Sequence, residues 1–202
     1  MAKAGSKRER ILEIAEANVL AKGFGATSIE EIIAEAEVTK SGFFYHFSDK
    51  NALAQALLQR YLDNEAAILD DVFGRAAAAH PDPLDAFLAG LTGMAELMAD
   101  LPGGHPGCLV ATYCYSERLF DSTVRALNRE ALFRWRTRFR EILDGIAAAH
   151  PPRDAVDLDA LADMVTTVLE GGIVLSKAMN QPAVLPQQVL LLRSYMKLLF
   201  AG

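Results

Sequence analysis

Apolar side chains recur three and four residues apart along most of the chain, which is the spacing of one face of an α-helix. Glycine, proline and capping residues divide this pattern into segments. Two short helices are predicted between residues 27 and 53, and the longer predicted helices span about residues 6–22, 49–78, 83–100, 107–119, 121–149, 157–179 and 186–201. The sequence has no internal repeat and no parallel-sheet pattern. It therefore predicts an all-α fold of about nine helices.

The segment 27–53 contains the capping residues of two successive short helices. Thr27 and Ser28 each have a glutamate three residues later, which is the spacing of a reciprocal capping box. Thr39 is placed to cap the second helix, and Lys40 follows in its first turn. A helix, a tight turn and a second helix in this order predict a helix-turn-helix unit.

The second of these short helices has the residue types that DNA reading requires. In a helix-turn-helix the second helix lies in the major groove with its N-terminal residues at the base edges. Small and hydrogen-bonding residues are therefore expected first, followed by aromatic residues that anchor the helix in the core. The first group is Thr39, Lys40, Ser41 and Gly42, and the second is Phe43, Phe44 and Phe47.

This segment resembles the DNA-binding signature of the tetracycline-repressor (TetR) family of bacterial regulators. The run that carries the resemblance is A-E-V-T-K-S-G-F-F-Y-H-F-x-x-K-x-A-L, preceded by R-x-x-I-L-x-x-A and K-G-F-x-x-T-S, over residues 8–55. The resemblance implies a homodimer with a three-helix DNA-binding domain, residues 1–48, that binds a palindromic operator in double-stranded DNA. It also implies a helical domain, residues 49–202, for dimerisation and for binding a small-molecule effector.

The residues that the signature assigns to DNA binding can be carried over position by position. They are Ser28, Thr39, Lys40, Ser41, Gly42, Phe43, Tyr45, His46 and Lys50. Two positions depart from the family pattern, because Ser41 precedes Gly42 and because the aromatic hydroxyl is on Tyr45 rather than on residue 44. His46 also fits a packing role at the end of the helix.

Charge alone argues against a nucleic-acid partner, because the chain carries a net charge of −6. Acidic residues slightly outnumber basic ones even within the first fifty residues. The basic residues, however, gather in the N-terminal arm, at the predicted reading helix and at the start of the next helix. We interpret them as a local positive footprint, and the alternative is a solvated surface of mixed charge.

Other classes of protein lack support in the sequence. No phosphate-binding glycine loop, HExxH, CxxC or nucleophile elbow is present, so neither an enzyme nor a metal or cofactor site is expected. No segment has the roughly 18 apolar residues of a membrane span, and no signal peptide is recognisable, which predicts a cytoplasmic protein without a membrane partner. The six-residue separation of Cys108 and Cys114 in one helix also argues against a disulfide between them.

The C-terminal part is expected to contain an effector pocket lined by apolar, aromatic and methionine side chains. The candidates are Tyr61, Phe87, Leu91, Met94, Met98, Cys108, Thr112, Tyr113, Trp135, Phe139, Met164 and Val168. Each of these also fits ordinary core packing. The expected effector is hydrophobic or aromatic, and an alternative function is a helical carrier of small molecules that does not use DNA.

Cys108 supports a further hypothesis, since it opens a predicted helix after a glycine-rich loop, where a thiolate is stabilised. The Gly-Cys-Leu triplet together with Lys177 resembles a TetR subgroup that includes electrophile-responsive repressors. A thiol-based electrophile sensor is therefore one alternative, and an inert buried cysteine is the other.

Two features of the last three long helices complete the predictions. The predicted helix 121–149 carries six arginines interleaved with apolar residues, which we interpret as a solvated or internally paired face rather than a nucleic-acid site. The two C-terminal helices contain more leucine, valine and methionine than one inward face requires. Gly171 and Gly172 permit close approach, and we expect a four-helix homodimer interface here.

Overall fold

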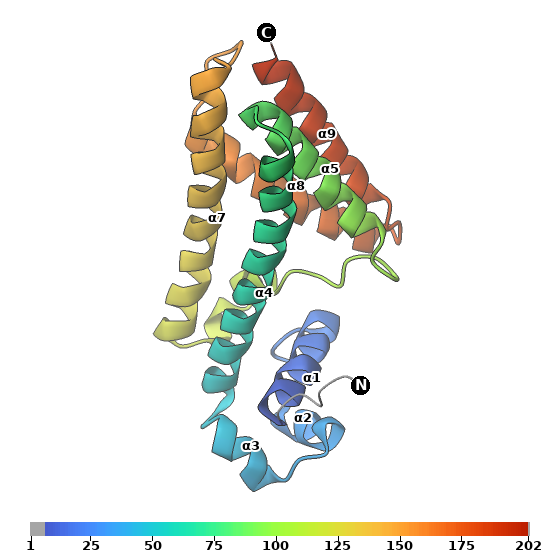
Figure 1. Cartoon of the computed structure of the whole chain (residues 1–202). Helices are drawn as coiled ribbons and strands as arrows, with labels where there is room; N and C mark the ends of the chain where they lie inside the picture. Colours follow the sequence, from blue (N-terminus) through green and yellow to red (C-terminus); the bar gives the residue numbers. More distant parts are fainter. Residues whose placement is uncertain (1–6, 202) are drawn as a thin grey trace. The chain divides into compact units, whose positions relative to one another are not determined.

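The computed structural model describes residues 7–201, and every regular element in this range is helical (Figure 1). The predicted all-α fold is confirmed, although the first residue of the predicted helix 6–22 lies outside the described residues. The elements are α1 (Lys7–Lys22), α2 (Ile29–Ala36), α3 (Lys40–His46), α4 (Lys50–Ala79), α5 (Pro83–Ala99), α6 (Leu109–Tyr115), the 3₁₀ turn η1 (Glu117–Leu119), α7 (Ser122–Ala149), α8 (Leu158–Ala178) and α9 (Val184–Phe200).

The predicted helix boundaries agree with these elements to within a few residues, with one exception. The helix predicted over residues 107–119 ends at Tyr115 and is followed by the separate turn η1. Ser116 ends α6 with a backbone that is not helical. The apolar spacing did not reveal this interruption because a 3₁₀ turn carries side chains at nearly the same spacing.

The chain forms two compact units. Unit 1 comprises Met1–Asn64 and Cys108–Ala131, and unit 2 comprises Glu65–Gly107 and Leu132–Gly202. The helices α4 and α7 each contribute to both units. The units group residues by packing, so unit 1 contains more of the chain than the predicted DNA-binding segment 1–48.

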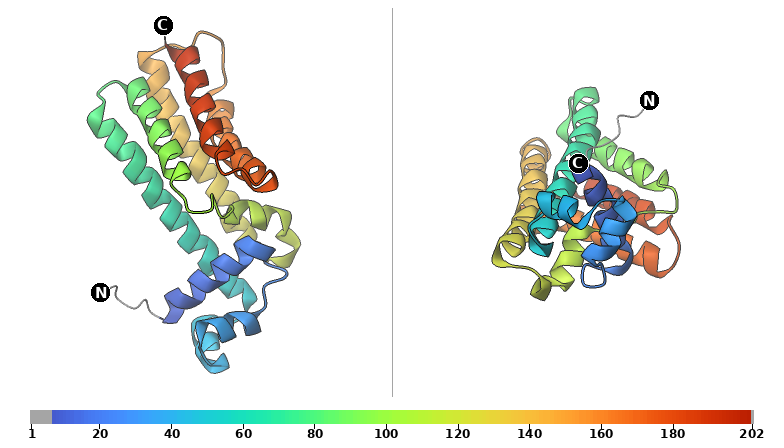
Figure 2. Two further views of the ribbon diagram at one scale, coloured as in Figure 1. Left: turned by 90° about the vertical axis from the view of Figure 1, so that its right-hand side faces the viewer. Right: turned by 90° about the horizontal axis from the view of Figure 1, so that it is seen from below.

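The core of unit 1 holds the first three helices together. α1 contacts both α2 and α3, and the three helices gather beside the first turns of α4 (Figure 2). The buried side chains of this core come from all four helices. They include Ile11, Leu12, Ala15, Val19, Ile32, Phe43, Phe47, Leu53 and Leu57. The short helices α2 and α3 are stabilised by this packing, because helices of about two turns are marginal on their own.

A second cluster in unit 1 is aromatic. The Phe24 ring, in the connection between α1 and α2, lies 5.7 Å from the Tyr113 ring and 4.7 Å from the Phe120 ring. The hydroxyl of Tyr113 donates a hydrogen bond of 3.0 Å to the carbonyl oxygen of Ala54 in α4. Burial, with a smaller contribution from Glu16, raises the pKa of Tyr113. The cluster therefore joins α6 to α4 through a neutral phenol.

Unit 2 is built on the contacts that α9 makes with α5 and with α8. Two glycines permit close approach between its helices. A side chain at Gly90 in α5 would meet the Phe73 ring at 2.4 Å, and one at Gly172 in α8 would meet Leu185 at 2.7 Å. Gly172 thus has the predicted packing role within the chain, whereas a side chain at Gly171 would meet nothing within 4 Å.

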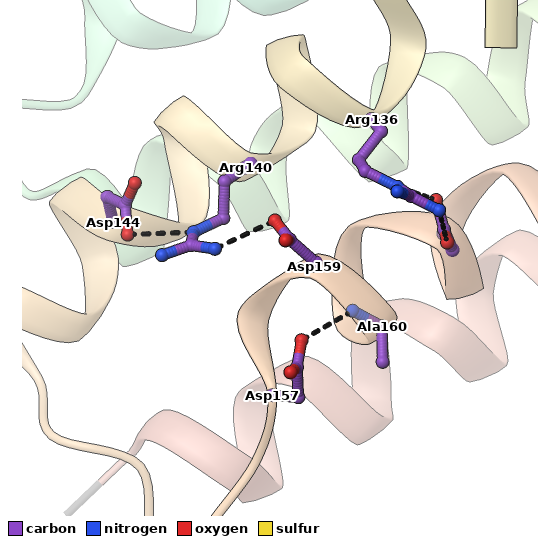
Figure 3. A network of polar contacts seen from close by, with 7 residues as sticks. Arg136, Arg140, Asp144, Asp157, Asp159 and Ala160 are labelled. Carbon is purple, nitrogen blue, oxygen red and sulfur yellow. Dashed lines mark hydrogen bonds and ion pairs between the residues drawn. The ribbon is translucent and has the colours of Figure 1, made fainter. Parts of the chain in front are cut away.

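Three of the six arginines of α7, namely Arg136, Arg138 and Arg140, are paired with carboxylates, which agrees with the prediction of an internally paired face. Arg136 binds Asp163 through two nitrogens at 2.8 and 2.5 Å. Arg140 bridges Asp144 at 3.0 Å and Asp159 at 2.7 Å, so that α7 and the start of α8 are joined (Figure 3). These pairs occupy the guanidinium groups that a nucleic acid would otherwise contact.

Candidate nucleic-acid interface

A complete capping box begins α2. The backbone N–H of Glu31 donates to Ser28 Oγ at 3.1 Å, and the N–H of Ser28 donates to Glu31 Oε2 at 3.1 Å. The hydrogen bond from Lys22, followed by that from Ser28, lowers the pKa of the Glu31 carboxyl. The prediction that Thr27 also acts as a cap is wrong. Its side chain is buried, and its hydroxyl donates to the carbonyl of Gly23 at 2.9 Å.

The turn between α2 and α3 depends on one residue in a left-handed conformation. Glu37 has φ 55° and ψ 40°, and its N–H donates to the carbonyl of Ala34 at 3.3 Å. A non-glycine residue is uncommon in this region of the backbone map. The Glu37 carboxylate accepts a hydrogen bond of 3.0 Å from Arg10, which connects the turn to α1.

The N-terminus of α3 exposes polar groups to solvent. Thr39 is the N-cap, as predicted, and its Oγ1 accepts a hydrogen bond of 3.0 Å from the N–H of Gly42. The same hydroxyl lies 3.2 Å from Ser41 Oγ. Lys40 and Ser41 are exposed. A side chain at Gly42 would lie 3.1 Å from Thr39 Oγ1, so glycine protects the cap.

Two rings anchor the opposite side of α3. Phe43 and Phe47 are 0% and 2% exposed, and their ring centroids are 5.6 Å apart. The prediction that Phe44 is buried as well is wrong, because its side chain is 40% exposed. A helix advances about 100° per residue, so Phe44 leaves the face that Phe43 shares with Phe47. Tyr45 lies further outward and is 85% exposed.

Three other predicted DNA-binding residues have internal contacts. Lys50 Nζ donates to the carbonyl of Phe24 at 2.9 Å and lies 4.7 Å from the centre of its ring, and burial lowers the pKa of this ammonium. The Ser28 hydroxyl belongs to the α2 cap. The His46 ring lies 5.0 Å from that of Tyr45. The exposed polar side chains at the start of α3 are those of Thr39, Lys40 and Ser41.

Residues 11–57 match the family model described as bacterial regulatory proteins, tetR family. The matched segment contains the capped helices, the tight turn and the anchored reading helix described above. This chain is a DNA-binding transcriptional regulator whose residues 11–57 are similar to those of TetR-family proteins. Proteins of this family are DNA-binding regulators and not enzymes.

Relatives over most of the chain support this assignment. The transcriptional regulator AcuR of Cereibacter sphaeroides is 29% identical over 161 residues, which cover 80% of this chain and 72% of that protein. The HTH-type transcriptional repressor DhaR of Mycobacterium sp. strain GP1 is 23% identical over 171 residues, which cover 84% of this chain and 82% of that protein. A crystal structure of the regulatory protein TetR from Rhodobacter sphaeroides has the same fold, with a TM-score of 0.80 and 22% identity over 96% of this chain and 100% of that one.

The candidate effector residues of this regulator are divided between the two units. Tyr61, Cys108, Thr112 and Tyr113 belong to unit 1, and the remaining eight belong to unit 2. In unit 1 the polar groups of two candidates are satisfied within the chain, because Tyr113 donates to Ala54 and Thr112 donates to the carbonyl of Cys108 at 2.9 Å. These hydroxyls are engaged in holding α6 in place.

In unit 2 the buried candidates are Phe87, Leu91, Met94 and Phe139, and the partly exposed ones are Met98, Trp135, Met164 and Val168. A residue that the sequence analysis did not select connects two of them. The Phe73 ring lies 5.8 Å from that of Phe87 and 5.9 Å from that of Phe139. Phe73 follows Val72, which lies on the inner side of the long helix α4. This position in the sequence could have identified Phe73 as a further candidate.

Neither Cys108 nor Cys114 forms a disulfide, and the two side chains have different surroundings. Cys108 is buried and is the N-cap of α6, where its Sγ accepts a hydrogen bond of 3.4 Å from the N–H of Ala111. Cys114 is exposed, and its Sγ lies 3.2 Å from Nδ2 of Asn128. Lys177 Nζ donates to the carbonyl of Pro106.

Within residues 7–201 no group of ligating side chains is arranged to hold a metal ion. None of the described helices is long and apolar enough to cross a bilayer.

Proposed function

We propose that this TetR-family regulator is a homodimeric repressor that leaves a palindromic operator when a small hydrophobic or aromatic effector binds. Residues 1–48 supply the DNA contacts in this proposal, and residues 49–202 supply dimerisation and effector binding. The observation that carries the proposal is the two-sided character of α3. Its N-terminus exposes Thr39, Lys40 and Ser41, while Phe43 and Phe47 are buried beneath them.

This arrangement suits the major groove for electrostatic and steric reasons. The N-terminus of a helix carries partial positive charge, which favours contact with phosphate oxygens. Lys40 adds a full charge at the same end, and the small side chains of Ser41 and Gly42 let the backbone approach the bases. The buried rings keep this surface formed in the absence of DNA, so binding requires no folding of the reading helix.

DNA binding through this surface can be tested with single substitutions. We expect Lys40→Ala to weaken operator binding by about 1–3 kcal/mol, the usual range for one contact of this kind. Thr39→Ala should weaken it too, because it removes both a candidate contact and a helix cap. Binding would be measured by mobility shift on DNA from the regulator's own upstream region, with Arg75→Ala, which removes an exposed basic residue of α4, as the matched control.

Both variants should remain dimers in sedimentation experiments. If both bind the operator as tightly as the unaltered protein, α3 does not read DNA. If the unaltered protein binds no upstream fragment in a salt-dependent manner, the carrier function is favoured over the repressor.

The exposed apolar residues of α8 and α9 support dimerisation through these helices. They are Val174, Leu175, Met179, Leu190, Leu191, Tyr195 and Leu198, each at least 41% exposed. Single exposed apolar residues are normal, but so many on two helices that pack against each other are typical of an interaction surface. Gly171 has open space around it and would allow the partner's backbone to approach.

The aromatic and methionine side chains of unit 2 support a hydrophobic effector. For release, the effector must bind more tightly to a dimer whose reading helices are misplaced, because a ligand with equal affinity for both states shifts neither. A crystal structure of the protein as purified, inspected for unassigned density beside Phe87 and Phe139, tests this part. A tightly packed core around both rings, with no ligand under saturating aromatic compounds, would contradict it.

The placement of Cys108 at the start of α6 supports an alternative, in which electrophiles trigger release from DNA. We expect Cys108→Ser to abolish such release and Cys114→Ser, at the exposed thiol, to leave it intact. Release that persists in Cys108→Ser would remove this alternative.

A further inference from the structure

One guanidinium in unit 1 contacts three carboxylates of another helix. Arg60 of α4 binds Glu9 through Nε and Glu16 through Nη1 at 2.5 Å, and its Nη2 lies 3.8 Å from Glu13. The Arg60 side chain is only 20% exposed. Pairs in partial shelter are screened less by salt than exposed pairs, so this contact has more energetic weight than a surface ion pair.

The three glutamates form a single stripe on α1, since positions 9, 13 and 16 follow the helical spacing of four and three residues. Three negative charges along one stripe repel each other unless a cation lies between them. Arg60 is that cation, and its planar fork of donors matches several carboxylates at once. The contact is therefore specific for arginine at this position.

Other faces of α1 contact the reading helix and its turn. Arg8 lies 5.5 Å from the centre of the Phe47 ring, below α3, and Arg10 binds Glu37 in the α2–α3 turn. α1 thus connects the reading helix on one side with Arg60 of α4 on another. A movement of α1 relative to α4 would change the direction in which α3 points.

Arg60 contacts α1 at a point on α4 that is far from the connection between α3 and α4. The reading helix is joined to α4 through the short connection at residues 47–49, and Lys50 binds the Phe24 carbonyl at the first turn of α4. Arg60 lies ten residues further along α4, which is about 15 Å of helix rise. Attachments near one end of α4 oppose rotation about that end only weakly, and a further attachment about 15 Å away opposes it more strongly.

We propose that Arg60 is a positioning residue for operator binding, which fixes the direction of α3 relative to α4 and thereby restricts the half-site spacing that the dimer accepts. This inference rests on the proposed function. Arg60 touches no DNA in this account and acts through α1. The charged and titratable groups that face Glu16 are Arg60 from α4, Glu9 and Glu13 from α1, and Tyr113 from α6.

The test compares operators of different spacing. A palindrome is first selected from random duplex DNA with the unaltered protein, and duplexes with one base pair added or removed between the half-sites are then prepared, together with a single half-site. One base pair rotates a half-site by about a tenth of a turn, so a rigid dimer should lose about tenfold in affinity. We expect Arg60→Met to reduce this tenfold discrimination to about twofold and to bind the single half-site normally.

Two further variants make the comparison specific. Arg75→Met removes an exposed arginine of the same helix that pairs only with Asp71 four residues away, among the contacts described for it, and should retain the full discrimination. The double variant Glu9→Gln and Glu16→Gln removes partners of Arg60 without leaving unpaired carboxylates. It should relax spacing as Arg60→Met does, and it serves if Arg60→Met does not fold.

The outcomes separate the two proposals. Unchanged spacing discrimination in folded Arg60→Met would overturn the positioning role. Equal losses on the half-site and on every palindrome would also overturn it, because they indicate that Arg60 only stabilises the domain. Failure of the unaltered protein to select any palindrome would instead contradict the proposed operator binding.

Discussion

The reading helix α3 and the C-terminal helices α8 and α9 expose opposite kinds of surface. α3 exposes a lysine and two hydroxyls at its N-terminus and a phenol in its last turn, and it keeps Phe43 and Phe47 inside. α8 and α9 expose leucine, valine and methionine side chains although Leu185 and Val189 already fill their inner face. One surface suits a polyanion and the other suits an apolar partner. Residue exposure therefore supports the two different binding functions proposed for this chain, whose net charge is −6.

The two surfaces also differ in how they are supported. α3 has only seven residues and depends on its anchor rings, whereas α8 and α9 have 21 and 17 residues and contact each other directly. Substitutions in the anchor should therefore destroy a surface, and substitutions on the outside should remove only a contact.

The largest expected effect is on stability, and it compares a buried ring of α3 with the partly exposed ring beside it. Phe43→Ala should lower the free energy of unfolding of the reading domain by about 3–5 kcal/mol, the usual cost of removing a buried ring. Phe44→Ala, one residue later and partly exposed, should cost less than about 1 kcal/mol. Urea unfolding of both variants, followed by circular dichroism, provides the measurement. Equal losses would show that the two rings are packed alike.

The apolar surface can be broken next. The double variant Leu191→Glu and Leu198→Glu places carboxylates on a face that would meet its own copy across a two-fold axis. Juxtaposed like charges cost several kcal/mol, so we expect a monomer in sedimentation and about a 100-fold loss of operator affinity. Thr137→Glu, at an exposed polar position of α7 outside the proposed interface, should remain dimeric. A dimeric double variant would place the interface elsewhere.

A smaller effect is expected from salt, which should weaken operator binding by α3 more than dimerisation through α8 and α9. Lys40→Ala should reduce the slope of log affinity against log salt by about one for each reading helix that loses a phosphate contact. Dimerisation through α8 and α9 should change little over the same salt range. Titrations at several salt concentrations, with Arg75→Ala as the control, check this. An unchanged slope would mean that Lys40 makes no phosphate contact.

The smallest effect concerns Glu16, whose pKa is raised chiefly by burial, against the opposing influence of Arg60. A raised carboxyl pKa means that the folded state holds its proton more tightly than the unfolded state. The resulting stabilisation is complete below the pKa of the unfolded chain and is lost as pH rises through the folded value. Glu16→Gln should therefore be slightly more stable than the unaltered protein at pH 7, and this difference should vanish near pH 4. A difference that grows toward low pH would contradict the assignment.

The helices and the reading motif were predictable from local patterns. Apolar spacing located the elements, and the cap at Thr39 followed from its own sequence neighbourhood. The errors arose where tertiary contacts compete for one group. Thr27 has the cap spacing but turns its hydroxyl back to Gly23, and Phe44 belongs to an aromatic run whose direction depends on the domain core.

The contacts between distant helices were not predictable in the same way. The sequence shows a lysine at position 50 but not that its ammonium binds the Phe24 carbonyl, 26 residues away. It shows three glutamates on α1 but not that they meet Arg60, which lies 44 to 51 residues further along. The sequence predicted that arginines of α7 could be paired within the chain, but it did not predict that some of their partners lie on α8.

The brevity of α3 has a practical consequence for engineering. Because the cap at Thr39 and the two inward rings keep this short helix in place, the outward positions 40, 41 and 45 could be randomised as a small library while residues 39, 43 and 47 stay constant. Clones from such a library would retain the scaffold and differ only in the bases they prefer. The molecule thus offers a compact starting point for retargeted genetic switches.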